Sequence, residues 1–161
     1  MRALLQRTTG ARVRVDEETL GSIGPGLVVF VGVGRGDDET AADGLARRIA
    51  ELRIFEDEDG RTNRSLLEVG GEALVVSQFT LYADTGRGRR PGFTDAAAPE
   101  LADRLYRRVA EALAALGVTV ATGRFGASMA VELVNDGPFT IWLDTDDRST
   151  AWKRPVVTDR A

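Results

Sequence analysis

The segment ALVVSQFTLY, residues 73–82, begins as a core strand and then changes character. Ala73 to Val76 form a continuous apolar run, which is typical of a buried strand. Three polar residues, Ser77, Gln78 and Thr80, follow almost at once. Either Ser and Thr cap local backbone groups at the end of the strand, or the polar side chains belong to a functional site. Residue type alone leaves both interpretations open.

Length and composition bound the kind of protein. A chain of 161 residues, 43% hydrophobic and 29% charged, is typical of one soluble globular domain. The net charge of −4 means that nucleic-acid binding requires a local basic patch. No apolar run approaches the length of a membrane span, and the start MRALLQRTTG is too short in apolar residues for a signal peptide. We therefore predict a cytoplasmic protein without membrane contact.

The chain contains no histidine and no cysteine, and its only lysine is Lys153. Serine or cysteine nucleophiles activated by histidine are excluded, and a zinc site is disfavoured. We expect no metal and no other cofactor. An enzyme of this composition must use a carboxylate, a group of its substrate, or backbone groups and positioning.

Strand-like segments lie toward both ends of the chain and around residue 73, with two helices between them. The expected strands are 2–9, 11–20, 27–33, the segment from 73, 118–125, 129–134 and 139–145. The expected helices are 38–53, which has acidic residues at its start, and 99–116, which begins with Pro99 and is followed by Gly117. We expect one domain over 1–145 and a polar tail over 146–161.

Two local patterns match a phosphate-binding loop and a calcium-binding loop only in part. The glycines of 32–36 lie between a strand and a helix, yet they lack the full spacing of a phosphate-binding loop and acidic residues follow them. The acidic run 56–59 lacks the ligand pattern of a calcium loop. We interpret the first as a strand-to-helix turn and the second as a solvated turn.

Two further stretches are unusual. The segment NDGPFT, 135–140, consists of turn formers and is first interpreted as a hairpin turn, but Pro138 then stands at the head of the following strand. The segment GRGRRP, 86–91, concentrates three arginines in a loop. Such a loop suits contact with phosphates, although exposed arginines are also common without any function.

Together these motifs resemble those of the bacterial D-aminoacyl-tRNA deacylases. That family combines SQFTL at a strand end with a downstream NxGPxT, and both are present here, at 77–81 and 135–140. The resemblance extends to four other segments: LLQR (4–7), RIFEDEDGRTN (53–63), RGRRPGF (87–93) and TGRF (122–125). It covers about residues 1 to 145; the chain departs from the family pattern at Thr8 to Ala11 and in the tail.

The resemblance implies a compact α/β domain with mixed β-sheets in β/β/α layers and two main helices. It implies hydrolysis of the ester of D-aminoacyl-tRNA, and of glycyl-tRNA mischarged on alanine tRNA, by a homodimer with active sites at the subunit interface. A cis Gly137–Pro138 motif from one subunit would enter the pocket of the other, where its carbonyls receive the substrate amino group. An L side chain would clash there, so chirality is selected by exclusion.

The roles of the other residues are hypotheses that rest on their chemistry together with this resemblance. Ser77, Gln78, Phe79 and Thr80 would be catalytic, with backbone N–H groups around Gln78 and Phe79 stabilising the oxyanion. Either the Thr80 hydroxyl attacks, or the neighbouring ribose hydroxyl of the tRNA activates water. The supporting residues would be Arg7, which could hold the Gly-Pro loop, and Asn135 and Thr140. The expected tRNA contacts are Arg87, Arg89 and Arg90.

Other functions remain open at this point. A related deacylase could clear a mischarged L-amino acid from tRNA with the same fold. The chain could also be a tRNA-binding module without catalysis. A general small-ester hydrolase is disfavoured, because no activated nucleophile is visible in the sequence.

Overall fold

The computed structural model describes residues 1–86 and 88–146. Its strands are β1 (Arg2–Val15), β2 (Glu18–Ile23), β3 (Gly26–Gly32), β4 (Arg53–Glu56), β5 (Thr62–Ser65), β6 (Glu72–Ser77), β7 (Thr119–Thr122) and β8 (Ala130–Asp144). Its helices are α1 (Glu39–Glu51), α2 (Leu66–Val69), the 3₁₀ turn η1 (Phe79–Tyr82) and α3 (Pro99–Ala115). The predicted α/β class is confirmed. The predicted tail lies outside the described residues except for Asp146, and so does Arg87.

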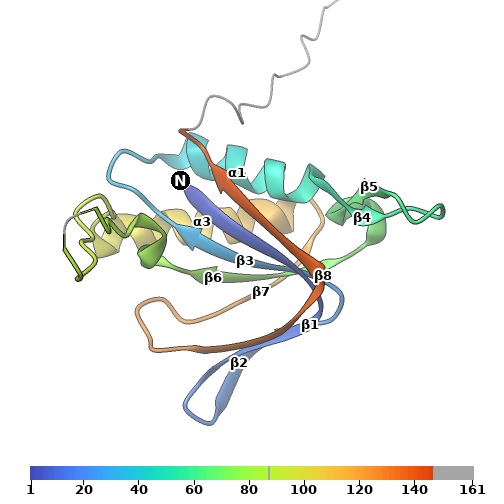
Figure 1. Cartoon of the computed structure of the whole chain (residues 1–161), viewed down its shortest axis with the longest axis horizontal. Coiled ribbons are helices and arrows are strands. Elements are labelled where there is room, and N and C mark those ends of the chain that lie inside the picture. The colour runs from blue at the N-terminus through green and yellow to red at the C-terminus, as the bar shows by residue number, and fades with distance from the viewer. Residues whose placement is uncertain (87, 147–161) are drawn as a thin grey trace, which may run out of the picture.

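Six strands form one mixed sheet, ordered β2-β1-β3-β6-β7, with β8 paired to β1. The pairs β3–β6 and β6–β7 are parallel, whereas β1 is antiparallel to β2, β3 and β8. A Cβ added at Gly21 in β2 would lie 3.0 Å from the carbonyl oxygen of Thr122 in β7, so the two outer strands approach closely. The sheet therefore curls toward a closed barrel, with α1 and α3 along one side (Figure 1).

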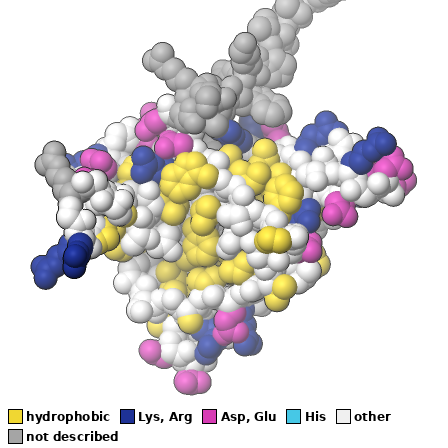
Figure 2. All heavy atoms as spheres, viewed as in Figure 1, with side chains coloured by type: hydrophobic (Ala, Val, Ile, Leu, Met, Phe, Trp, Pro, Cys, Tyr) yellow, Lys and Arg dark blue, Asp and Glu magenta, His cyan; other side chains and the backbone are white. Residues whose placement is uncertain are grey.

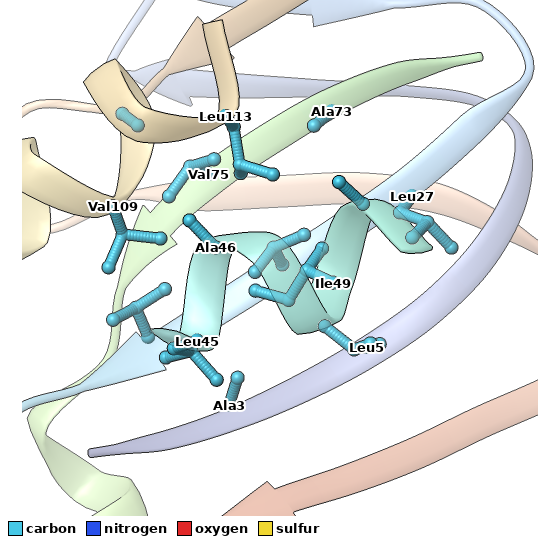
Figure 3. Packing of buried hydrophobic residues seen from close by; sticks show 14 of the residues in the cluster. Ala3, Leu5, Leu27, Leu45, Ala46, Ile49, Ala73, Val75, Val109 and Leu113 are labelled. Carbon is cyan, nitrogen blue, oxygen red and sulfur yellow. The ribbon is translucent and has the colours of Figure 1, made fainter. Parts of the chain in front are cut away.

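The central strands are buried on both faces, which explains their continuous apolar runs. One face of β3 and β6, represented by Leu27 and Val75, packs against α1 and α3 (Figure 3). The other face, represented by Val28 and Leu74, packs inside the curled half of the sheet. No helix in the described part of the chain is long and apolar enough to cross a bilayer.

Both predicted helices are present, with ends shifted by no more than two residues. The Asp38 carboxylate accepts a hydrogen bond from the Ala41 N–H, 2.8 Å away, and so caps the start of α1. Pro99 occupies the first turn of α3, and Gly117 follows its end with a φ of 99°, a conformation that favours glycine. The start of α1 and both ends of α3 could be predicted because Asp38, Pro99 and Gly117 are features of the local sequence.

The predicted break between strands 2–9 and 11–20 is wrong. β1 continues through Gly10, where the Thr8 hydroxyl donates to the Gly10 carbonyl at 2.7 Å and accepts from the Gly10 N–H at 3.1 Å. In the pairing with β8, Thr8 lies opposite Asn135 and Ala11 lies opposite Leu133. Three residues along β1 therefore correspond to only two along β8. The glycine therefore marks a bulge within a bent strand, and the turn comes later, at Asp16 and Glu17.

The predicted hairpin turn at 135–140 is also wrong, because β8 runs without interruption along β1. Gln6 lies opposite Thr140 and Thr8 lies opposite Asn135, so two residues along β1 correspond to five along β8. The turn formers thus make a large bulge in one strand. Sequence analysis also missed β4, β5, α2 and η1, which are all short elements of four residues.

Candidate active site

The polar residues after Val76 form a tight turn at the end of a buried strand. The last ladder bond joins the Gln78 N–H to the Val31 carbonyl at 2.7 Å, and η1 starts at the next residue. Phe79 and Thr80 open this turn, so their N–H groups have no partner within it. Among the N–H groups around Gln78 and Phe79 that were predicted to stabilise an oxyanion, the Gln78 N–H is already bonded to β3. Within the first three residues of η1, the donors left are the N–H groups of Phe79 and Thr80, because the Leu81 N–H donates to the Gln78 carbonyl at 3.3 Å.

The side chains of this turn do not serve as backbone caps. No hydrogen bond joins the Ser77 hydroxyl to any described residue, and η1 has no side-chain cap. The Thr80 hydroxyl accepts a hydrogen bond from the side-chain amide of Gln78. Thr80 is exposed and has no basic group as its partner. The local capping interpretation is thus not supported, and the turn offers hydroxyl, amide and N–H groups outward.

A cavity of about 560 Å³ opens beside this turn. Ser77, Gln78 and Phe79 form part of its wall, and the rest comes from β6, from β3 and the residue after its end, from α3, and from the segments 93–99 and 125–131. The other residues in its wall are Val31, Val33, Val76, Phe93, Ala96, Ala97, Pro99, Ala102, Tyr106, Phe125, Gly126, Ala127, Met129 and Val131. Most of these side chains are apolar, so the cavity suits an apolar or weakly polar group.

Aromatic rings flank the cavity at two places. Phe79 is 58% exposed, and its ring meets that of Phe93 edge to face with centroids 4.9 Å apart. Deeper inside, the rings of Tyr106 and Phe125 lie 6.2 Å apart. Burial raises the pKa of Tyr106, so its phenol is a neutral donor, and it donates to the Val75 carbonyl at 3.1 Å. Sequence analysis missed these four rings as a group, because they come from segments that are distant in the sequence.

The Gly137–Pro138 peptide bond is cis and lies in the exposed β8 bulge. Gly137 has a φ of 134°, which is left-handed, and a Cβ there would lie 3.0 Å from the Phe139 nitrogen. Asn135 braces the bulge from both sides, since its Oδ1 accepts from the Phe139 N–H at 2.8 Å and its Nδ2 donates to Thr140 Oγ1 at 2.9 Å. The predicted supporting residues Asn135 and Thr140 thus hold the shape of the bulge.

Arg7 lies behind this bulge and is buried. Its Nε donates to the Asp136 carbonyl at 3.1 Å and its Nη1 donates to the Ile54 carbonyl at 2.9 Å. Its guanidinium carbon also lies 4.9 Å from the centroid of the Phe139 ring. The Asp136 carboxylate lies 3.3 Å from Arg7 Nε, and the Glu56 carboxylate lies 3.8 Å from Arg7 Nη2. Arg7 therefore joins β1, the β4 strand and the Gly-Pro bulge through one planar group.

The two halves of the predicted site do not meet within one chain. None of residues 135–140 belongs to the wall of the cavity beside Ser77. Arg89 and Arg90 are exposed in the loop that follows η1. Two backbone hydrogen bonds between Asp84 and Gly92 close this loop. This loop leads directly to Phe93 at the cavity.

Comparison with known proteins identifies the family. The family model for D-Tyr-tRNA(Tyr) deacylase matches residues 4–144. The chain belongs to the D-Tyr-tRNA(Tyr) deacylase family. It is 60% identical over 146 residues to the D-aminoacyl-tRNA deacylase of Symbiobacterium thermophilum, covering 91% of this chain and 97% of that one. It is 59% identical over 149 residues to the D-aminoacyl-tRNA deacylase of Paracoccus denitrificans, covering 92% and 100%.

Two solved structures share the fold of this chain. The c-Myc DNA unwinding element binding protein superposes with a TM-score of 0.86 at 37% identity, covering 90% of this chain and 99% of that protein. A probable eukaryotic D-amino acid tRNA deacylase shares the fold, with a TM-score of 0.78 at 18% identity, covering 88% and 97%. The family resemblance and the prediction of an enzyme that hydrolyses ester bonds of aminoacyl-tRNA are therefore confirmed.

Proposed function

We propose that this chain hydrolyses the ester of D-aminoacyl-tRNA and of glycyl-tRNA mischarged on alanine tRNA, and so proofreads the chirality of translation. The observation that carries the proposal is the turn of Ser77 to Thr80 in a member of a deacylase family. This turn presents N–H donors that have no partner among the described residues, beside an apolar cavity. A cytoplasmic location follows from such a substrate.

In the proposed reaction, water adds to the ester carbonyl and passes a proton to the neighbouring ribose hydroxyl, which gives its own proton to the ribose oxygen that the tetrahedral intermediate expels. The N–H groups of Phe79 and Thr80 are the donors for the developing oxyanion, because the Gln78 N–H is already bonded. The Thr80 hydroxyl has a Gln78 amide as its neighbour, and an amide cannot take up a proton at neutral pH. This supports activation of water by the ribose hydroxyl next to the ester rather than attack by Thr80.

The cavity suits the terminal nucleoside of the tRNA. Bases stack on aromatic faces with little dependence on sequence, and Phe79 and Phe93 present such faces at the wall. Arg89 and Arg90 stand on the adjoining loop and would contact the backbone phosphates. Arg87, which would act with them, lies outside the described residues.

The active unit would be a homodimer that joins the two halves of the site. Gly137 and Pro138 are exposed and absent from the cavity of their own chain. On the same strand, Val134 and Trp142 are 63% and 46% exposed. Figure 2 shows hydrophobic side chains gathered over β1 and β8. A patch of this kind favours a protein partner, and a second copy would also bring a Gly-Pro bulge to each cavity.

Stereochemical choice would then depend on exclusion by the bulge. Backbone carbonyls of Gly137 and Pro138 would accept hydrogen bonds from the substrate ammonium group, which leaves no space for an L side chain. A D side chain would point away from the bulge. Glycine has no side chain to exclude, which explains why the same site would accept glycyl-tRNA.

Incubation of the protein with matched D- and L-tyrosyl-tRNA, following loss of the ester, tests the proposal. We expect rapid loss of the D ester and retention of the L ester. Preferential loss of the L ester would instead support a deacylase for mischarged L-amino acids. Binding of both without ester loss would support a tRNA-binding module.

A further inference from the structure

The turn η1 is too short to fix its own position. A four-residue 3₁₀ turn contains only a few hydrogen bonds, and their geometry is weaker than in an α-helix. At its start, Phe79 and Thr80 are exposed, and the Phe79 ring contacts Phe93 edge to face. The bond from the Gln78 N–H to the Val31 carbonyl holds the residue before Phe79, so the position of the Phe79 and Thr80 N–H groups depends further on what holds the other end of the turn, at Leu81 and Tyr82.

Tyr82 anchors that end in the body of the protein. Tyr82 is only 7% exposed. Its side chain packs against the residues that follow β3, since a Cβ added at Gly34 would lie 2.7 Å from the phenol oxygen. The phenol lies 3.3 Å from Asp37 Oδ2, to which it donates a hydrogen bond. Burial raises the pKa of Tyr82, so the phenol keeps its proton for this bond.

Asp37 is a buried carboxylate with three partners. Its Oδ2 also accepts from the Gly34 N–H at 2.6 Å, and its Oδ1 lies 2.5 Å from the Met1 ammonium group. A charged donor and two further hydrogen bonds compensate the burial of this carboxylate. Asp37 thus holds the Tyr82 phenol at a fixed point of the sheet.

Arg2 holds the same end of the turn from β1. Its Nη1 donates to the Leu81 carbonyl at 2.9 Å, and its guanidinium carbon lies 4.3 Å from the centroid of the Tyr82 ring. Its Nε donates to Asp144 Oδ2 at 3.0 Å, which ties it to β8. One side chain therefore contacts both residues that end η1.

We infer that Arg2, Tyr82 and Asp37 form a clamp that positions the N–H groups of Phe79 and Thr80 for the reaction. They are positioning residues, since none of them belongs to the wall of the cavity. The inference rests on the proposed function for its catalytic consequence. A small displacement of reacting groups lowers rates steeply, so loosening the end of the turn is expected to reduce kcat more than it changes KM.

Tyr82→Phe is the sharpest test, because it removes only the hydroxyl and keeps the ring. We expect kcat on D-tyrosyl-tRNA to fall about tenfold, with a smaller change in KM. Amide hydrogen exchange of residues 78–83 should become faster. Arg2→Gln should have the same effects, and Arg2→Lys should recover part of the loss. Arg12→Gln is the matched control, since Arg12 lies on the same strand, is exposed and pairs with Glu132.

Unchanged kcat and unchanged exchange in Tyr82→Phe and Arg2→Lys would overturn the clamp, and so would lost activity without faster exchange in 78–83. If Arg2→Gln does not fold, the other two variants decide. If the wild-type protein has no deacylase activity, the proposed function is wrong. The rate of amide hydrogen exchange in residues 78–83 then still tests the clamp by itself. In that case faster exchange in Tyr82→Phe supports the clamp and unchanged exchange refutes it.

Discussion

The guanidinium of Arg7 donates through Nε to the backbone carbonyl of Asp136, 3.1 Å away, one residue before the cis Gly137–Pro138 bond. A buried side chain thereby determines where an exposed backbone motif stands. Arginine suits this position because its planar fork also reaches the Ile54 carbonyl. Lysine carries the same charge but lacks that geometry.

Arg7→Lys is therefore expected to lower kcat/KM on D-tyrosyl-tRNA about tenfold and to narrow the preference for D over L substrate. Loss of hydrogen bonds from a charged group should also reduce the free energy of unfolding, by roughly 1.5–3 kcal/mol for each bond lost. Parallel kinetics on both substrates and urea unfolding measure these effects. Arg12→Lys serves as the control on the exposed part of the same strand. An unaltered D/L ratio in Arg7→Lys would contradict a role in specificity.

Gly137→Ala should lose most of its activity. Its φ of 134° disfavours any side chain, and the new Cβ would lie 3.0 Å from the Phe139 nitrogen. The strained backbone is expected to cost about 1–3 kcal/mol of stability. In contrast, Gly44→Ala in α1 meets no atom within 4 Å and should stabilise the protein by up to about 1 kcal/mol. Thermal unfolding and deacylation assays compare the two; an active, unstrained Gly137→Ala protein would count against the proposed role of the bulge.

Phe79→Ala should weaken substrate binding without changing stability. The ring is 58% exposed, so little buried area is lost on truncation. Stacking of a base on an aromatic ring contributes about 1–3 kcal/mol, which corresponds to at least a roughly fivefold rise in KM. Leu67→Ala, another exposed hydrophobic residue, is the control. If KM stays constant in Phe79→Ala, the base does not stack on this ring.

Thr80→Val separates the two mechanisms, because it replaces the hydroxyl with a methyl group of similar size. With the ribose hydroxyl as activator, kcat should fall less than about tenfold, whereas a substrate without that hydroxyl should lose about a hundredfold or more. Single-turnover kinetics on both ribose forms give these values. Two results together would restore Thr80 as the nucleophile. The folded Thr80→Val protein would bind tRNA but be completely inactive, and the wild-type protein would turn over the deoxy substrate at the full rate.

Arg89→Gln combined with Arg90→Gln should weaken tRNA binding and its dependence on salt. Each lost phosphate contact should reduce the slope of log K against log salt by about 0.7–0.9. Turnover at saturating substrate should stay at the wild-type value. Arg108→Gln is a suitable control, since Arg108 pairs with Asp43 between the two long helices. Salt titrations that give identical slopes for the double variant and the wild-type protein would exclude these arginines from the tRNA contact.

Local sequence was enough to predict the elements whose ends depend on neighbouring residues. The Asp38 cap, Pro99 at the start of α3 and Gly117 after it fixed both helices to within two residues. The apolar runs of β3 and β6 predicted buried strands, because a strand covered on both faces has few polar positions. The motif residues also carried the family resemblance, which does not depend on knowing their neighbours in space.

Only the tertiary structure decided what those residues face. Pairing with β1 turned the segment 135–140 from an expected hairpin into a bulge, and pairing with β3 removed the Gln78 N–H from the possible oxyanion donors. The same long-range contacts brought Arg2 and Asp37 to the end of η1. Backbone hydrogen bonds between distant segments determine which groups remain available, and no local pattern encodes that choice.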